Sequence, residues 1–541
     1  MFEAAELGNT IDKATFQEQV PVLRTQLLQV QQRLRRANFP VILVFAGVDG
    51  AGKSETANLV NEWMDPRWIV TRAYGEPSDE EKERPEFWRY WRDLPPRGVI
   101  GCFLSSWYSQ PVLDHVYGRK SDAELDLALD RIVAFERGLA NDGALILKFW
   151  MHLGREAQKE RFEALERDPL TRWRVTQTDW DHWRMYDRFI ATAERAIMRT
   201  SVGQAPWEIV EGADFRYRSL TVSKVIKDGI ERRLAEVEMA QRVAAEIALE
   251  ESSARKPEKT HRKGNGKEKR PPAADGKDTI VVAPSVSILS KLDMNQALSR
   301  KNYEEKLEFY QGRLNRLSRE AHERGVSSML VFEGWDAAGK GGAIRRITAA
   351  LDARNSQVIP IAVPSDEEKA HHHLWRFWRH LSRAGRQTIF DRSWYGRVLV
   401  ERIEGFATDG EWMRGYAEIN DFEEQLVGHG IVLVKYWMHI TKDEQLRRFK
   451  RRQKIPYKQW KLTDEDWRNR EKWELYEQAV NDMIARTSTS TSPWTLVEGN
   501  SKRFARIKTI ATYCEKLEEA LVHARGGTEE PAVLPQKKRN R

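Results

Sequence analysis

A glycine-rich loop that carries a carboxylate follows an apolar run in the second half of the chain. It reads Gly-Trp-Asp-Ala-Ala-Gly-Lys-Gly-Gly and fits the G-x-x-x-x-G-K frame, whose backbone N–H groups hold phosphate at a helix N-terminus. Gly341 stands where Ser or Thr usually binds Mg²⁺, and Asp336 puts a negative charge among donors meant for phosphate. Because a magnesium–phosphate complex supplies a compensating cation, the loop predicts phosphoryl transfer with an acidic metal ligand. The expected phosphate-binding residues are Gly334, Ala337, Ala338, Gly339, Lys340, Gly341 and Gly342.

A second group of charged residues follows the apolar segment 388–390. Asp391 comes directly after it, which after a phosphate loop is the usual place for a second Mg²⁺ ligand. Arg392 and Arg397 carry the planar fork that suits bidentate phosphate contacts, so we expect both to reach the transferring phosphates. A structural ion pair is the alternative for Asp391 and Arg392 taken alone. Their position after the loop favours the catalytic interpretation.

A cationic helix is predicted over residues 444–454. Five cations fall within six positions without an interleaved acid, and like charges at i,i+4 repel each other. A solvated surface is the alternative, but this charge density favours a lid that closes over a polyanion. The residues of this predicted lid are Arg447, Arg448, Lys450, Arg451 and Arg452.

Apolar segments alternate with helical ones around these motifs, which predicts a parallel sheet with helices on both faces. In such a sheet, ligands bind at the carboxyl ends of the strands, where the phosphate loop falls. The run His371-His372-His373 is expected on a helix, where consecutive side chains diverge by roughly 100° and cannot converge on one metal ion. The predicted strands are 328–332, 358–362, 387–390, 431–436 and 494–497.

The chain contains a tandem duplication. A second phosphate-loop pattern, Gly47–Ser54, precedes the first by 287 residues, and matching motifs keep this offset over the 166 residues from Gly47 to Gly212. Repeat units of about 20–50 residues are typical of solenoids, so each copy here is a whole domain. The predicted division is a degenerate domain at 1–249, a basic flexible linker at 250–284, a catalytic domain at 285–525 and a disordered basic tail at 526–541.

The two repeats differ in the residues that carry chemistry. The first keeps Asp49 and Lys53 of the loop, but Leu104, Ser105 and Gln110 stand in place of Asp391, Arg392 and Arg397. We therefore expect the first repeat to be catalytically silent, as a packing partner or an aid to phosphate binding. The alternative is that it still binds nucleotide through the backbone of its loop. The residues that replace the five lid cations are Glu160, Arg161, Glu163, Ala164 and Leu165.

Composition and charge narrow the possible cellular location and binding partners of the protein. With 31% charged and 40% hydrophobic residues and no long apolar run, neither a membrane span nor a signal peptide is predicted. The two cysteines lie far apart, which favours a reducing cytoplasm. The net charge of +8 is concentrated in residues 255–277 and 537–541, so a solvated spacer is preferred to a nucleic-acid-binding segment.

These motifs together resemble the polyphosphate kinase 2 family. The resemblance is carried by the Gly334–Gly342 loop, by Asp391-Arg392-Ser393-Trp394-Tyr395 and by Lys435-Tyr436-Trp437-Met438-His439, and it covers roughly residues 10–245 and 290–520. The tandem arrangement is similar to the AMP-phosphorylating subfamily. The resemblance implies two P-loop kinase domains related to thymidylate kinase, each with a parallel sheet flanked by helices and a helical lid.

The same resemblance implies a reaction in which inorganic polyphosphate donates a phosphoryl group to AMP and gives ADP, with Mg²⁺ as cofactor. It assigns Asp336, Lys340, Asp391, Arg392 and the cationic segment 447–452 as the functional set, with Asp336 and Asp391 as metal ligands. Three rivals stay open: an ATP-dependent nucleoside monophosphate kinase, an ADP-phosphorylating polyphosphate kinase and a basic nucleic-acid-binding P-loop protein. The residues leave base preference, chain length, direction and oligomeric state open, a homo-oligomer included.

Overall fold

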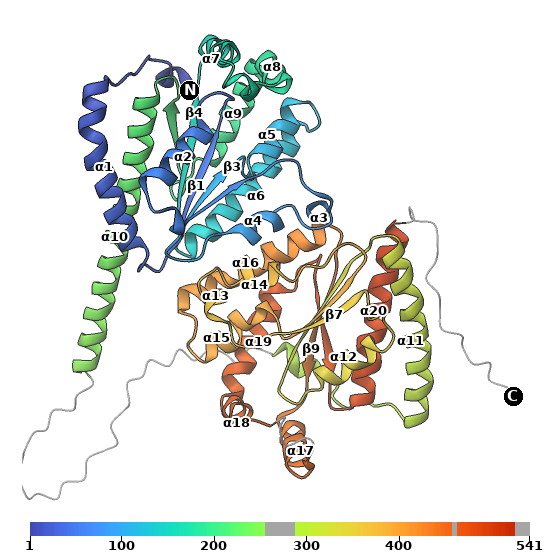
Figure 1. Ribbon diagram of the computed structural model, residues 1–541. Coiled ribbons are helices and arrows are strands. Elements are labelled where there is room, and N and C mark those ends of the chain that lie inside the picture. Colours follow the sequence, from blue (N-terminus) through green and yellow to red (C-terminus); the bar gives the residue numbers. More distant parts are fainter. Residues whose placement is uncertain (255–286, 457–461, 525–541) are drawn as a thin grey trace, which may run out of the picture.

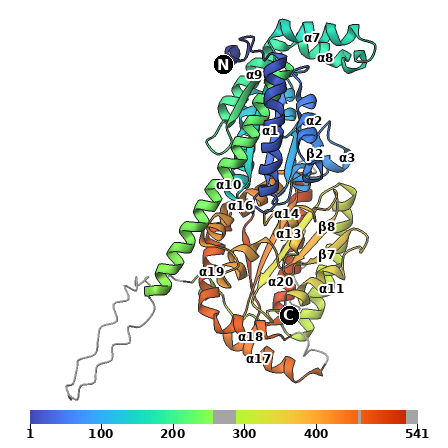
Figure 2. The ribbon, with the colours of Figure 1, turned by 60° about the vertical axis from the view of Figure 1, so that its left-hand side comes forward.

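The chain folds into two α/β domains stacked end to end. The computed structural model describes residues 1–254, 287–456 and 462–524. Each domain is built on one five-stranded sheet with helices on both faces (Figure 1). Figure 2, turned by 60°, shows α7 and α8 at one end of the molecule and α17 and α18 at the other. Within the described residues, no helix is long and apolar enough to cross a membrane.

The N-terminal domain has the parallel strand order β2-β3-β1-β4-β5. Its strands are β1 (Val41–Gly47), β2 (Ile69–Ala73), β3 (Ile100–Leu104), β4 (Leu145–His152) and β5 (Trp207–Glu211). Its helices are α1 (Lys13–Leu34), α2 (Lys53–Trp63), α3 (Asp79–Lys82), α4 (Trp88–Asp93), α5 (Ser109–Val116), α6 (Asp122–Asn141), α7 (Arg155–Arg167), α8 (Gln177–Arg184), α9 (Tyr186–Thr200) and α10 (Phe215–Ala254).

The C-terminal domain repeats this topology as β7-β8-β6-β9-β10. Its strands are β6 (Ser328–Gly334), β7 (Ser356–Pro360), β8 (Gln387–Asp391), β9 (Val432–His439) and β10 (Trp494–Glu498), which confirms the five predicted strands, with β7 earlier than expected. Its helices are α11 (Arg300–Glu323), α12 (Lys340–Thr348), α13 (Asp366–Lys369), α14 (Trp375–Trp378), α15 (Val400–Ile403), α16 (Asp409–Gly428), α17 (Lys442–Gln453), α18 (Asp464–Glu471), α19 (Trp473–Thr487) and α20 (Lys502–Ala524).

The register of β6 brings the predicted motifs to one edge of the sheet. Phe332 pairs with Asp391 of β8 on one side and with Tyr436 of β9 on the other. Residues 328–333 of β6 are all buried, as expected for the central strand of a parallel sheet covered on both faces. The loop after Gly334 and the carboxylate of Asp391 therefore emerge next to each other.

The Ser-Trp-Tyr motif shared by the two repeats is structural. In the C-terminal domain, Trp394 Nε1 and Tyr395 OH both donate to Glu423, and Lys435 Nζ lies 2.6 Å from the same buried carboxylate. The N-terminal domain repeats this arrangement around Glu136, at 2.7 Å from Lys148. A buried charge pair is tolerated only when hydrogen bonds satisfy it, so this motif preserves the fold in both copies.

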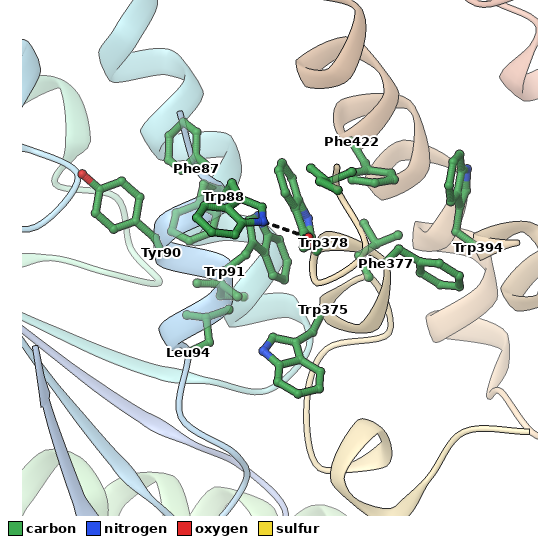
Figure 3. Close-up of a cluster of buried hydrophobic side chains, with 14 of the residues drawn as sticks. Phe87, Trp88, Tyr90, Trp91, Leu94, Trp375, Phe377, Trp378, Trp394 and Phe422 are labelled. Carbon is green, nitrogen blue, oxygen red and sulfur yellow. Dashed lines mark hydrogen bonds between the residues drawn. The ribbon is translucent and has the colours of Figure 1, made fainter. Parts of the chain in front are cut away.

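The two domains meet through α4 and α14, whose aromatic side chains form a shared cluster (Figure 3). Trp88 Nε1 donates to the carbonyl of Trp378 across the boundary at 3.0 Å. At the edge of the cluster, Arg84 Nε donates to the Leu381 carbonyl and Arg383 pairs with Glu83. The interface is therefore an apolar core with a polar rim.

Two expectations about connecting segments need correction. The predicted linker 250–284 begins inside α10, which continues to Ala254; its remainder and the predicted tail 526–541 lie outside the described residues. His371–His373 is not helical but lies in the turn before α14. The side chains therefore do not diverge as they would on a helix: the rings of His372 and His373 lie 4.6 Å apart and both face Glu418.

Candidate active site

A pocket of about 1050 Å³ lies over the carboxyl ends of the C-terminal sheet. The phosphate loop, the end of β8, α17 and the start of α20 all contribute to its walls. The glycines shape its floor: Gly334 has φ 145° and a Cβ there would collide with the carbonyl of Met438. A Cβ on Gly339, which caps α12 in the left-handed region, would meet no atom within 4 Å. The cradle at the helix N-terminus is therefore open to a ligand.

The charged residues of the loop and of β8 lie together in this pocket, as expected. Lys340 Nζ donates to the Gly334 carbonyl at 2.6 Å. Asp336 lies 3.5 Å from Arg392 and accepts a hydrogen bond of 2.9 Å from Asn469. Arg392 has φ 65°, a conformation that costs energy for a residue with a side chain and clusters at functional sites.

Asp336 and Asp391 fit a hard divalent cation. Both line the pocket, and within the described residues no hydrogen bond or ion pair engages the Asp391 carboxylate. Mg²⁺ is bound by one or two protein carboxylates together with substrate phosphates. The carboxylates of Asp336 and Asp391 are therefore suitable protein ligands for a magnesium–phosphate complex.

A third carboxylate, Glu333, lies beneath the loop and was not predicted from the sequence. It accepts a hydrogen bond from Ser393 Oγ at 2.8 Å. Burial raises its pKa, against the opposing effect of Lys340 and Arg392. A single Glu in the apolar run of β6 is only a weak signal of a functional residue. Its difference from Ala46, at the equivalent position of the first repeat, was a second signal in the sequence.

The predicted lid helix divides into residues with different roles. Arg448 is buried and donates to the carbonyls of Ala337 and Ala338 in the loop and to those of Gly499 and Asn500 after β10. It therefore clamps the backbone of the site rather than gripping a ligand. The prediction overlooked its partner Glu444, one turn earlier, which pairs with both Arg447 and Arg448.

The other lid cations are also unequal in position. Arg451, Arg452 and the largely exposed Arg447 line the pocket. Lys450 is exposed and is not among the lining residues. The structure therefore brings four of the five predicted cations to the site.

Arg397 is the catalytic candidate that the structure places elsewhere. Its guanidinium pairs with Glu401 at 3.3 Å and its stem packs against Gly415, outside the set of lining residues. The short 3-10 helix η5 (Trp394–Val398) turns the chain away from the pocket after Arg392. The structure therefore places Arg397 outside the pocket that the other catalytic candidates share.

Further cations complete the pocket and were missed in the sequence. Among the described residues, the lining contains eleven Lys or Arg against four Asp or Glu, which suits a polyanionic ligand. Burial and the neighbouring arginines lower the pKa of Lys502 to about 8. Two of the missed cations lie in the last turn of α12 and three in the first turns of α20. The missed cations are Arg345 and Arg346 on α12 and Lys502, Arg503 and Arg506 on α20.

His372, His373 and Glu418 form a cluster in which His373 is hydrogen-bonded to Glu418. His373 Nε2 lies 2.6 Å from Glu418, and His372 Nε2 lies 3.6 Å from the same carboxylate oxygen. The Leu374 N–H donates to His372 Nδ1, so in the neutral ring the proton lies on Nε2, the atom that a shared metal would need. The cluster therefore ties the α14 turn to α16.

The fold and the pocket define a P-loop phosphotransferase with two domains, of which the C-terminal one holds this pocket. The family model for polyphosphate kinase 2 (PPK2) matches twice, over residues 10–238 and 297–525. The chain therefore belongs to the polyphosphate kinase 2 family.

Similar proteins span the whole chain. It is 49% identical over 521 residues to a polyphosphate:AMP phosphotransferase of Pseudomonas aeruginosa, covering 96% of this chain and 99% of the relative. A protein of the same name from Pseudomonas syringae pv. tomato is 44% identical with the same coverage. The crystal structure of a putative polyphosphate kinase 2 from Pseudomonas aeruginosa PA01 superposes with a TM-score of 0.81 at 46% identity, covering 96% of this chain and 99% of that one.

Proposed function

We propose that this protein is a polyphosphate:AMP phosphotransferase, which moves the terminal phosphoryl group of inorganic polyphosphate to AMP and yields ADP. The observation that carries the proposal is the cationic pocket over the second phosphate loop, whose lining includes eleven basic side chains from the part of the chain that the structure describes. An ordinary nucleotide site needs fewer cations, whereas a chain of phosphates presents one negative charge or more at each unit. The names of the two-domain relatives support AMP as acceptor.

The chain's own residues supply positioning and charge. Backbone N–H groups of Ala337 and of residues 339–341, together with the ammonium of Lys340, hold phosphate oxygens at the start of α12. Arg392 faces the same pocket and stabilises the negative charge on the phosphoryl group during its transfer. The acceptor phosphate attacks the terminal phosphorus in line, and the shortened polyphosphate leaves. No covalent enzyme intermediate is required.

Asp336 and Asp391 would hold the metal, which we propose is Mg²⁺. When bound, the ion would neutralise phosphate charge during the transfer. Arg448 keeps the loop carbonyls fixed while this happens, and Arg447, Arg451 and Arg452 face the polyanion. We place the reaction in the cytoplasm, since both cysteines are free thiols.

The N-terminal repeat is proposed to be catalytically silent, with the domain division 1–249, 250–284, 285–525 and 526–541. Lys53→Ala and Lys340→Ala variants test this assignment. Turnover should vanish for Lys340→Ala and persist for Lys53→Ala. Equal loss in both variants contradicts the assignment.

A matrix of donors and acceptors tests the function. AMP, ADP and GMP are each incubated with long-chain polyphosphate or with ATP, and the products are separated by anion exchange. We expect ADP to form from AMP and polyphosphate. ATP as the sole effective donor points to a nucleoside monophosphate kinase, and ADP as the preferred acceptor points to an ATP-forming polyphosphate kinase. Loss of turnover on deletion of residues 255–277 supports the nucleic-acid-binding alternative.

A further inference from the structure

The phosphate loop of the N-terminal domain keeps its backbone shape although its catalytic partners are gone. Gly47, Gly50 and Gly52 have positive φ, and Gly52 caps α2 as Gly339 caps α12. Ser105 retains the positive φ of its counterpart Arg392. The backbone conformation of the loop is thus preserved. Whether the loop can bind a ligand depends on which side chains occupy the space at the N-terminus of α2.

A carboxylate of the chain itself lies at this helix N-terminus. Glu55, in the first turn of α2, stands at the position equivalent to Gly342. Its side chain accepts hydrogen bonds from Arg161 at 3.0 Å and from Arg174 at 3.2 Å, and it pairs with Arg218. Three guanidinium groups therefore surround one carboxylate at a helix N-terminus. Phosphate groups are bound in the same way, by arginines and a helix N-terminus.

The guanidinium of Arg218 also fills the cradle. Its side chain is 3% exposed and it donates to the Gly212 carbonyl at 2.7 Å. The guanidinium lies so close to Gly52 that a Cβ atom on this glycine would overlap it. A Cβ atom on Gly339, the equivalent residue of the C-terminal domain, would meet no atom within 4 Å. The C-terminal repeat has Ala505 in place of Arg218. Two differences, Gly to Glu and Ala to Arg, therefore convert an open cradle into a filled one.

The loop carboxylate of the N-terminal repeat is also engaged internally. Asp49 lies 3.3 Å from Lys53 Nζ and 2.7 Å from His182 Nδ1. In the C-terminal repeat, Asn469 stands at the position of His182 and donates to Asp336 without bringing a charge. Asp49 is therefore engaged by the ammonium of Lys53 and by the ring of His182, both on its own chain.

We infer that the N-terminal phosphate loop is filled by its own side chains, with the Glu55 carboxylate held where a phosphate group would bind, so that this domain takes no nucleotide or polyphosphate. Removal of that carboxylate would expose Lys53, Arg161, Arg174 and Arg218 as an anion site. The N-terminal phosphate loop is thus a masked anion site, in addition to having lost the lid cations of the C-terminal repeat.

The test uses the full chain and inorganic tripolyphosphate as the probe. Hydrogen–deuterium exchange reports each loop separately, through amides 50–56 and 337–343. In the wild-type protein, tripolyphosphate should slow exchange at 337–343 and leave 50–56 unchanged. In Glu55→Ala it should slow both, and calorimetry should find one more bound tripolyphosphate per chain than in the wild type.

Glu62→Ala is the matched control, because it removes an exposed carboxylate from the same helix; it should behave as the wild type. Turnover of AMP in Glu55→Ala should be unchanged, which shows that the C-terminal site is intact. Protection of 50–56 in the wild-type protein overturns the inference, and this result does not depend on the folding of any variant. A folded Glu55→Ala that gains neither protection nor binding overturns it as well.

Discussion

Trp91 and Trp378 occupy equivalent positions in the two repeats and stack on each other across the domain boundary, with ring centroids 5.7 Å apart and an angle of 12° between their planes. A residue that contacts its own counterpart lies on a two-fold axis. The duplicated chain is therefore packed as a pseudo-symmetric pair, and its domains are related as the subunits of a dimer would be.

Replacing either tryptophan should weaken the coupling of the two domains. Because both are buried, Trp91→Ala or Trp378→Ala should cost about 3–5 kcal/mol of unfolding free energy. Urea unfolding followed by tryptophan fluorescence and by loss of turnover measures this effect. The two transitions should coincide in the wild type and separate in the variants. Coincident, unshifted transitions in both variants would show that the interface contributes little.

Arg392 and Arg397 should differ sharply in kinetics. Arg392 faces the pocket beside Asp336, so Arg392→Ala should lower kcat by about 10³-fold or more. Arg397 pairs with Glu401 outside it, so Arg397→Ala should lower kcat less than about tenfold in folded protein. Steady-state assays at saturating polyphosphate compare the two. A loss of roughly 10³-fold or more in both variants would show that Arg397 also acts on the transferring phosphate, as the sequence predicts.

Arg448 should behave as a structural clamp and Arg447 as a surface cation. Arg448→Ala leaves four backbone carbonyls and Glu444 without their buried partner, at a cost of about 3 kcal/mol or more. Arg447→Ala should change stability by less than about 1 kcal/mol, because its side chain is largely exposed. Thermal unfolding separates the two, and equal melting temperatures would contradict the clamp.

Polyphosphate affinity should fall as salt is added, since ions screen attraction between exposed charges. Lys502→Ala removes one pocket cation and should reduce this salt dependence while raising the KM for polyphosphate more than that for AMP. Lys516, on the same helix but paired with Glu519 at the surface, provides the control variant. Salt dependence that is the same in all three proteins would place Lys502 outside the path of the polyphosphate.

Acid should destabilise the α14 turn through His373. Burial lowers the pKa of this ring from 6.5 to about 4. The folded state therefore binds its proton later than the unfolded chain, and stability present above pH 6.5 is lost as the pH falls toward 4. The loss is at most about 3 kcal/mol. Urea midpoints at neutral and acidic pH should converge in His373→Gln, which keeps a donor for Glu418, and not in the surface variant His429→Gln.

The sequence by itself determined the duplication, the parallel sheets and the residues of the loop. A constant offset between motifs requires no coordinates, and a glycine frame after an apolar run reflects local backbone physics. The loss of Asp391 and Arg392 from the first repeat was equally visible, because it compares aligned positions.

Only the tertiary structure decided which charges face the ligand. Arg448 and Arg451 lie on one helix and both line the pocket, yet Arg448 is buried and donates to backbone carbonyls whereas Arg451 is exposed. Arg397 is near Arg392 in the chain but is carried away by η5. Glu55 meets Arg218 across 163 positions of sequence. Helical spacing relates neighbours along the chain, whereas the partner of a charge is set by how distant elements pack.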